Sequence, residues 1–148
     1  MQNVPEPTAI EVVTYASDDV LAALTSLLPQ LSATAAPLNR QTFEAVVENP
    51  GTQLLIARHN GSIVGALTLV LYTIPTGLRA RIEDVVVDYV ARGHGIGKAL
   101  TATAVDIANQ HGARTVDLTS APSKVTANHL YQGLGFKPRE STTYRLSL

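Results

Sequence analysis

The sequence predicts a mixed α/β domain of the α+β type, with helices on both faces of one mostly antiparallel sheet of six to seven strands. Three observations predict this fold. β-branched segments separated by turn residues occupy the first half of the chain, and apolar residues at helical spacing occupy several other segments. The length of 148 residues suits one domain, residues 1–148, with a core of its own.

The N-terminal third predicts one strand and two helices. Residues 1–8 hold two prolines and little apolar content, so we expect a loose tail. A β-branched segment at 10–15 predicts the first strand. A helix is expected after Ser17, ending or bending at Pro29, and Asn39 is a candidate cap for a second short helix.

The middle of the chain predicts an antiparallel meander. A strand at 54–57 is followed by Asn60-Gly61, the favoured pair for a type I′ hairpin turn. The return strand covers 63–74, and a further strand covers 79–87, ending in three consecutive valines.

In the last third of the chain, the spacing of apolar residues changes from that of strands to that of a helix. Apolar residues from Ile96 to Ile107 recur at helical spacing, and a short strand follows at 115–119. A strand, a helix and a strand imply a right-handed crossover, so 115–119 should lie parallel to Val85–Val87. A final helix over 127–134 and strand material over 136–146 complete the predicted fold.

Composition excludes several classes of function. The chain has no cysteine, so disulfides and thiolate chemistry are excluded. Its formal net charge of −1 argues against nucleic acid or an anionic membrane as partner. The N-terminus lacks the features of a secretory signal, and the longest apolar stretch, 63–74, is too short to span a bilayer as a helix. We therefore expect a cytoplasmic protein.

The segment Arg92-Gly93-His94-Gly95-Ile96-Gly97 joins an apolar strand to an amphipathic helix. Its three glycines allow a tight turn and close approach to a ligand. The helix start adds unpaired N–H groups and the positive end of the dipole, and Arg92 and Lys98 flank the loop with positive charge. The segment therefore predicts a phosphate or pyrophosphate site.

Two common phosphate loops do not fit. A P-loop needs Ser or Thr after Gly-Lys, and here Ala99 follows Lys98. A dinucleotide fingerprint starting at Gly93 would place its third glycine at Lys98. Neither an NTPase nor a dinucleotide-binding domain is therefore expected.

The loop instead matches the pattern R/Q-x-x-G-x-G/A and resembles the acetyl-CoA loop of the GNAT N-acetyltransferase superfamily. The run from Ala127 to Phe136 resembles that family's second signature, A-x-x-x-Y-x-x-x-G-F. The resemblance covers roughly Gln53 to Leu146. It implies a GNAT-like fold with the acetyl-CoA loop between the fourth strand and the third helix, and acetyl-CoA as co-substrate without a metal.

The resemblance also implies roles for individual residues. Val85, Val86 and Val87 should offer backbone groups to the pantetheine arm, and Asn128 should either bind that arm or face solvent. Tyr131 should protonate the departing thiolate, which suits a phenol with an ordinary pKa of about 10. The CoA pyrophosphate should be held by the guanidinium of Arg92 and by the backbone amides of the remaining cofactor-binding residues: Gly93, His94, Gly95, Ile96, Gly97 and Lys98.

The proton acceptor and the acceptor substrate stay open. Glu83 is the first candidate base, with Asp84 or a water as alternatives; strand alternation places Glu83 on one face with Arg81 and Val85. The expected function is transfer of acetyl from acetyl-CoA to a primary amine of a small molecule, peptide or protein. A non-catalytic CoA-binding or regulatory module is the alternative, and a homodimer through the C-terminal strand stays open.

Overall fold

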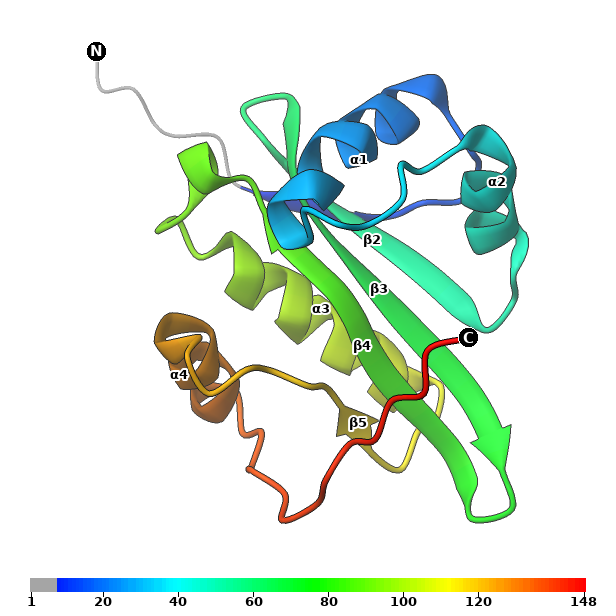
Figure 1. Ribbon diagram of the computed structural model, residues 1–148, viewed down its shortest axis with the longest axis vertical. Coiled ribbons are helices and arrows are strands. Elements are labelled where there is room, and N and C mark those ends of the chain that lie inside the picture. The colour runs from blue at the N-terminus through cyan, green and yellow to red at the C-terminus, as the bar shows by residue number, and fades with distance from the viewer. Residues whose placement is uncertain (1–7) are drawn as a thin grey trace.

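One sheet in the order β1-β2-β3-β4-β5 runs through residues 8–148, the part of the chain that the computed structural model describes (Figure 1). The first four strands are antiparallel neighbours, and β5 lies parallel to β4. The predicted mixed, mostly antiparallel sheet is confirmed, with five strands among the described residues rather than six to seven. The strands are β1 (Ala9–Val12), β2 (Thr52–His59), β3 (Ser62–Ile74), β4 (Gly77–Val87) and β5 (Val116–Asp117).

Helices cover both faces of the sheet, as predicted. Helices α1 (Asp18–Leu31) and α2 (Arg40–Glu48) pack on one face, where Phe43 and Leu27 are buried. Helix α3 (Ile96–Gln110) packs on the opposite face, and α4 (Val125–Gly133) lies beside it (Figure 1). A single 3₁₀ turn, η1 (Tyr89–Ala91), connects β4 to the loop before α3.

Local sequence signals explain several element boundaries. Asn39 caps α2, because its Oδ1 accepts a hydrogen bond of 2.8 Å from the Thr42 backbone N–H. Asn60 and Gly61 both have positive φ, 52° and 80°, as a type I′ turn requires. Pro29 lies inside α1, which ends two residues later at Leu31.

The predicted final strand at 136–146 is absent from the described residues. The apolar side chains of Tyr144 and Leu146 in this region, and that of Leu148 just after it, are exposed. Strand β5 has only two residues, so the outer edge of the sheet offers few backbone groups to pair with another strand.

The described residues begin at Thr8, so the predicted loose tail over 1–8 otherwise lies outside them. The Thr8 hydroxyl lies 3.2 Å from Nδ1 of His59. None of the helices in this described part combines the length and the apolarity that a bilayer crossing requires.

Candidate functional site

The loop before α3 has a backbone that only glycine adopts without strain at two positions. Gly93 and Gly95 have φ of 86° and 73°, and a Cβ at either position would meet nothing within 4 Å. The glycines are therefore required by conformation and not by crowding. Gly95 is the N-cap residue of α3, so the turn directly delivers the chain into the helix.

The backbone N–H groups of this loop are unpaired. Within residues 8–148, no hydrogen bond is donated by the amides from Gly93 to Lys98; the first one of α3 runs from Ala99 N to Gly95 O, 3.0 Å. These amides precede a helix of 15 residues, whose dipole places positive charge at this end. The arrangement can bind an anion.

Side chains around the loop fix it at both ends. Arg92 Nε donates a hydrogen bond of 3.2 Å to the carbonyl oxygen of Val87, which ties the loop to the end of β4. The ring of His94 stacks on His59 with centroids 5.7 Å apart, which ties the loop to the β2–β3 hairpin. Lys98 is exposed in the first turn of α3, where its charge adds to that of the helix end.

Strand β4 loses its partner on one side before it ends. β5 pairs with Ala80 and Arg81 only, so the prediction of a parallel neighbour is confirmed, but its expected position beside Val85–Val87 is wrong. From Ile82 to Val87, the edge of β4 that faces away from β3 has no strand partner among the described residues. An extended ligand can therefore lie along this edge as an added strand would.

A β-bulge at Asp84 separates the two halves of β4. Thr68 pairs with Glu83 but Ala66 pairs with Val86, so Asp84 and Val85 share one opposing residue on β3. Asp84 has a left-handed φ of 51°, which is uncommon for a residue other than glycine.

The bulge reverses the alternation of side chains along β4. Before it, Ala80 and Ile82 pack on the α3 side; after it, Val85 and Val87 do so, and Val86 is buried against α1 and α2. The expectation that Glu83 and Val85 share a face is therefore wrong, because that expectation assumed a regular strand.

The two carboxylates at the bulge differ in environment. Glu83 Oε1 lies 2.5 Å from Arg81 Nε, so the predicted pairing of these two side chains is present. The pKa of Asp84 is raised above its usual value, first by burial among protein atoms and second by the charge of Glu83. The raised pKa makes the Asp84 carboxylate a stronger base than an ordinary aspartate.

Helix α4 brings Tyr131 to the same region as a half-buried phenol. Burial raises the pKa of Tyr131 above its ordinary value of 10, so the hydroxyl is protonated at neutral pH. Its ring packs edge-on against Phe136 with centroids 6.0 Å apart, which fixes the plane of the phenol. No side-chain hydrogen bond engages the hydroxyl within residues 8–148, so it can donate to a ligand.

The start of α3, the end of β4 and α4 converge at Gly97. A Cβ there would lie 3.5 Å from Leu130 Cδ1 and 3.7 Å from Val87 Cγ2. The glycine loop, the three-valine segment and the helix carrying Tyr131 therefore meet at one place, as the sequence predicts for a single site.

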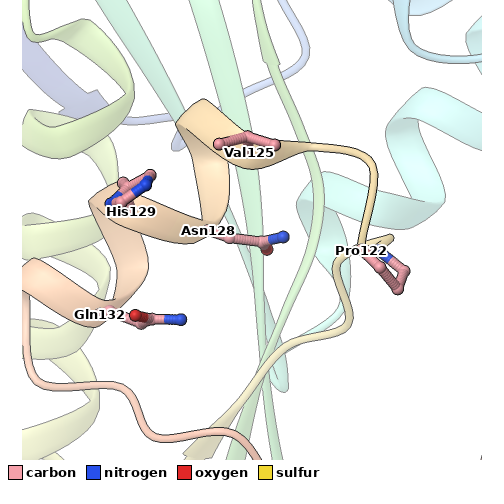
Figure 2. A pocket seen from close by; sticks show the side chains of 5 residues that line it. All are labelled: Pro122, Val125, Asn128, His129 and Gln132. Atoms are coloured by element: carbon pink, nitrogen blue, oxygen red, sulfur yellow. The ribbon is translucent and has the colours of Figure 1, made fainter.

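An open hollow of about 200 Å³ lies along α4 (Figure 2). Asn128 Nδ2 donates a hydrogen bond of 3.1 Å to Ala121 O, so its donor group anchors the β5–α4 loop while its carbonyl oxygen stays free. Sequence reasoning singled out only Asn128 among the residues that line this hollow. The lining residues are Pro122, Val125, Asn128, His129 and Gln132.

Comparison with known proteins adds sequence and fold relationships. A curated relative, glucosamine 6-phosphate N-acetyltransferase of Trypanosoma brucei brucei, is 37% identical over 92 residues, a match that spans 60% of this chain and 60% of that protein. An acetyltransferase structure from Trypanosoma brucei has 29% identity and a TM-score of 0.78, covering 96% of this chain and 100% of the other.

A transcriptional regulator structure from Bacillus halodurans C-125 shares the fold, with a TM-score of 0.82 at 23% identity and coverage of 96% of this chain and 100% of that chain. The model of the acetyltransferase (GNAT) family matches residues 20–136, which contain the glycine loop, the bulged strand and Tyr131. Because that match includes most of the chain, the protein belongs to the acetyltransferase (GNAT) family.

Proposed function

We propose that this protein transfers the acetyl group of acetyl-CoA directly to a primary amine. The observation that carries the proposal is the row of unpaired backbone amides from Gly93 to Lys98 at the start of α3. A pyrophosphate supplies the negative charge and the acceptor oxygens that such a row binds. Membership of the acetyltransferase (GNAT) family supports acetyl-CoA as the molecule that carries this pyrophosphate.

The unpaired edge of β4 is where the pantetheine arm would lie. The edge from Ile82 to Val87 leads toward the glycine loop, so an arm hydrogen-bonded along the three valines ends at the bulge. The thioester would then lie between the bulge and α4. Free N–H groups on this edge can stabilise the negative charge that develops on the thioester oxygen.

Reaction requires a proton acceptor for the amine. The amine nitrogen attacks the thioester carbonyl carbon and forms the new C–N bond, and a base takes its proton. Glu83 is the first candidate for this base, although Arg81 occupies part of its carboxylate. Asp84, with its raised pKa, or a bound water acting for either carboxylate, is the competing candidate.

The proton donor is Tyr131 in this proposal. As the C–S bond breaks, the thiolate takes the phenol proton and leaves as free CoA. Support comes from the burial that keeps the phenol protonated and from the contact between α4 and the glycine loop at Gly97. Proton return from the base through solvent completes the cycle with an amide and CoA as products.

Amino sugars are the first acceptor class to test. The curated relative is named for a phosphorylated amino sugar. Arg79 and Arg81 lie on one face of β4, where they attract an anionic group, while Asp117 on the adjoining strand repels one. A panel that contains amino sugars with and without a 6-phosphate, aminoglycosides and peptide amines separates these possibilities.

The test is release of free CoA thiol from acetyl-CoA across this amine panel, together with calorimetric titration of CoA. Turnover of any amine with CoA binding supports the proposal. A non-catalytic binding or regulatory module is the alternative, and the fold relative described as a transcriptional regulator makes it concrete. CoA binding without turnover of any amine would favour that module.

The predicted homodimer belongs to the same proposal. The exposed apolar residues Tyr144, Leu146 and Leu148 offer a surface for it at the C-terminal end of the chain. Light scattering of the purified protein measures its mass directly, and a monomer at all concentrations would exclude the homodimer.

A further inference from the structure

We infer that Gln30 positions the turn that delivers the chain from β4 into the glycine loop, an inference that rests on the proposed use of acetyl-CoA. Gln30 lies in the last turn of α1, which packs on the face of the sheet opposite α3 (Figure 1). Both polar atoms of its side chain bind the turn η1. Oε1 accepts a hydrogen bond of 3.0 Å from the Tyr89 backbone N–H, and Nε2 donates one of 3.4 Å to Oδ1 of Asp88.

These hydrogen bonds fix the orientation of the Gln30 amide. A backbone N–H can only donate, so Tyr89 selects the oxygen of the amide, and the amide nitrogen then faces the Asp88 carboxylate. Asp88 caps η1, because its Oδ1 also accepts a hydrogen bond of 3.3 Å from the Val90 N–H. Gln30 therefore completes a cap in which each donor meets an acceptor.

Few other contacts hold the turn. Of the three residues of η1, only Ala91 is buried, and it packs into the core on the α3 side. The side chains of Tyr89 and Val90 are 67% and 70% exposed. Packing from one face of the sheet therefore holds the end of the turn, whereas Gln30 holds its start from the other face.

The turn determines where the glycine loop begins. Before the turn, Asp88 N donates a hydrogen bond of 2.8 Å to Val64 O on β3. After it, Arg92 begins the loop, and its Nε donates a hydrogen bond of 3.2 Å back to the Val87 carbonyl oxygen. A rotation of the turn about Asp88 would therefore displace the Arg92 guanidinium and the loop amides together.

A row of backbone amides binds a pyrophosphate best when the amides already point to one place. Ordering a loose loop on binding costs free energy, and a loop that is held beforehand avoids that cost. Gln30 supplies this order from α1 and lies outside the glycine loop, so it is a positioning residue. Its loss should weaken the affinity for CoA, and the chemical step, which the proposed function assigns to other residues, should keep its rate.

The test exchanges the polarity of the contact. Gln30→Glu keeps an acceptor for the Tyr89 N–H but places a second carboxylate against Asp88, where a donor was. We expect this variant to bind CoA roughly 10-fold more weakly, the scale of one hydrogen bond to a charged group. Its kcat at saturating acetyl-CoA should stay within about twofold of the wild-type value, because Gln30 does not touch the reacting atoms in this proposal.

A second substitution should rescue the first. When Asp88→Asn is added to Gln30→Glu, the new amide donates to the new carboxylate and still accepts from the Val90 N–H. The double variant should therefore return to within about twofold of the wild-type affinity for CoA. Gln41→Glu is the control for charge, because it makes the same change at an exposed position of α2, and it should bind CoA as the wild type does.

Calorimetric titration of CoA measures the affinities, and thermal unfolding of the free proteins measures the stability that a merely structural contact would supply. A lower Tm with wild-type CoA affinity in Gln30→Glu would overturn the inference and leave the proposed function intact. So would a double variant that recovers its Tm but not its affinity for CoA. Failure of the wild-type protein to bind CoA would overturn both, so the two failures are distinguishable.

Discussion

Arg81 Nη2 donates a hydrogen bond of 2.7 Å to the hydroxyl of Thr119, beyond the point at which the backbones of β4 and β5 stop pairing. The same guanidinium also contacts Glu83 through Nε. One side chain of β4 therefore binds the segment that follows β5 where the two strands diverge, and we expect the width of the gap between them to depend on its planar, multidentate geometry.

Replacement of this guanidinium by an ammonium tests that dependence. Arg81→Lys cannot keep both contacts, so we expect a loss of about 1 kcal/mol in the free energy of unfolding and a several-fold rise in KM for acetyl-CoA. Arg79→Lys is the matched control, because Arg79 binds two threonine hydroxyls away from the gap. It should lose similar stability with KM unchanged; equal KM values in both variants would contradict the role of Arg81.

Loss of the phenol hydroxyl should affect turnover and not binding. Tyr131→Phe keeps the ring and its edge-on contact with Phe136, so the fold and the CoA affinity should persist. We expect kcat to fall by roughly 10² or more, the scale of general acid loss. Steady-state kinetics with titration of CoA measures both quantities. An unchanged kcat would remove Tyr131 from the mechanism.

A side chain at Gly95 should strain the loop. Gly95→Ala forces a left-handed residue to carry a Cβ, which destabilises the protein by about 1–2 kcal/mol although the Cβ meets nothing. Gly133→Ala, at a helical glycine with similar open space, should be neutral or stabilising by up to about 1 kcal/mol. Denaturant unfolding of the two variants gives the comparison, and equal effects would show that the left-handed backbone costs nothing here.

The raised pKa of Asp84 predicts a pH-dependent stability difference. Folding disfavours its ionised form, so the stability that its protonated form contributes is present below the unfolded pKa of 3.8 and is lost as pH rises through the raised folded pKa. Asp84→Asn stays neutral and tolerates a left-handed backbone, so it should raise Tm at neutral pH. The gain should shrink as the pH falls toward about 4.

The same substitution separates the two candidate bases. If Asp84 accepts the amine proton, Asp84→Asn abolishes the acidic limb of the kcat/KM profile and Glu83→Gln retains it. The converse result assigns the role to Glu83, and a limb retained in both variants assigns it to water. Glu83→Gln should not gain stability, because it loses the ion pair with Arg81.

Structural features that are determined by a few neighbouring residues could be predicted well from the sequence. The cap at Asn39 and the turn at Asn60 and Gly61 depend on local backbone chemistry and are present in the structure. The parallel direction of β5 follows from the handedness of crossovers. The juxtaposition of the glycine loop and the helix carrying Tyr131 follows from the family resemblance.

The predictions that proved wrong concern features that depend on pairing between distant segments. Alternation along β4 was misassigned because a bulge at Asp84 is set by the register with β3, which a single strand does not reveal. Strand β5 pairs with Ala80 and not with the valines for the same reason.

The extra residue in β4 decides which of the three valines faces which side of the sheet. Deletion of Asp84 would place Val85 directly after Glu83 and restore a regular ladder, in which every later side chain of the strand keeps its present face. Val86 would stay in the core beneath α1 and α2, and Val85 and Val87 would stay on the α3 side. A one-codon loss at this position therefore preserves the packing of the three valines, whereas one residue inserted between Val85 and Val86 would exchange the faces of Val86 and Val87.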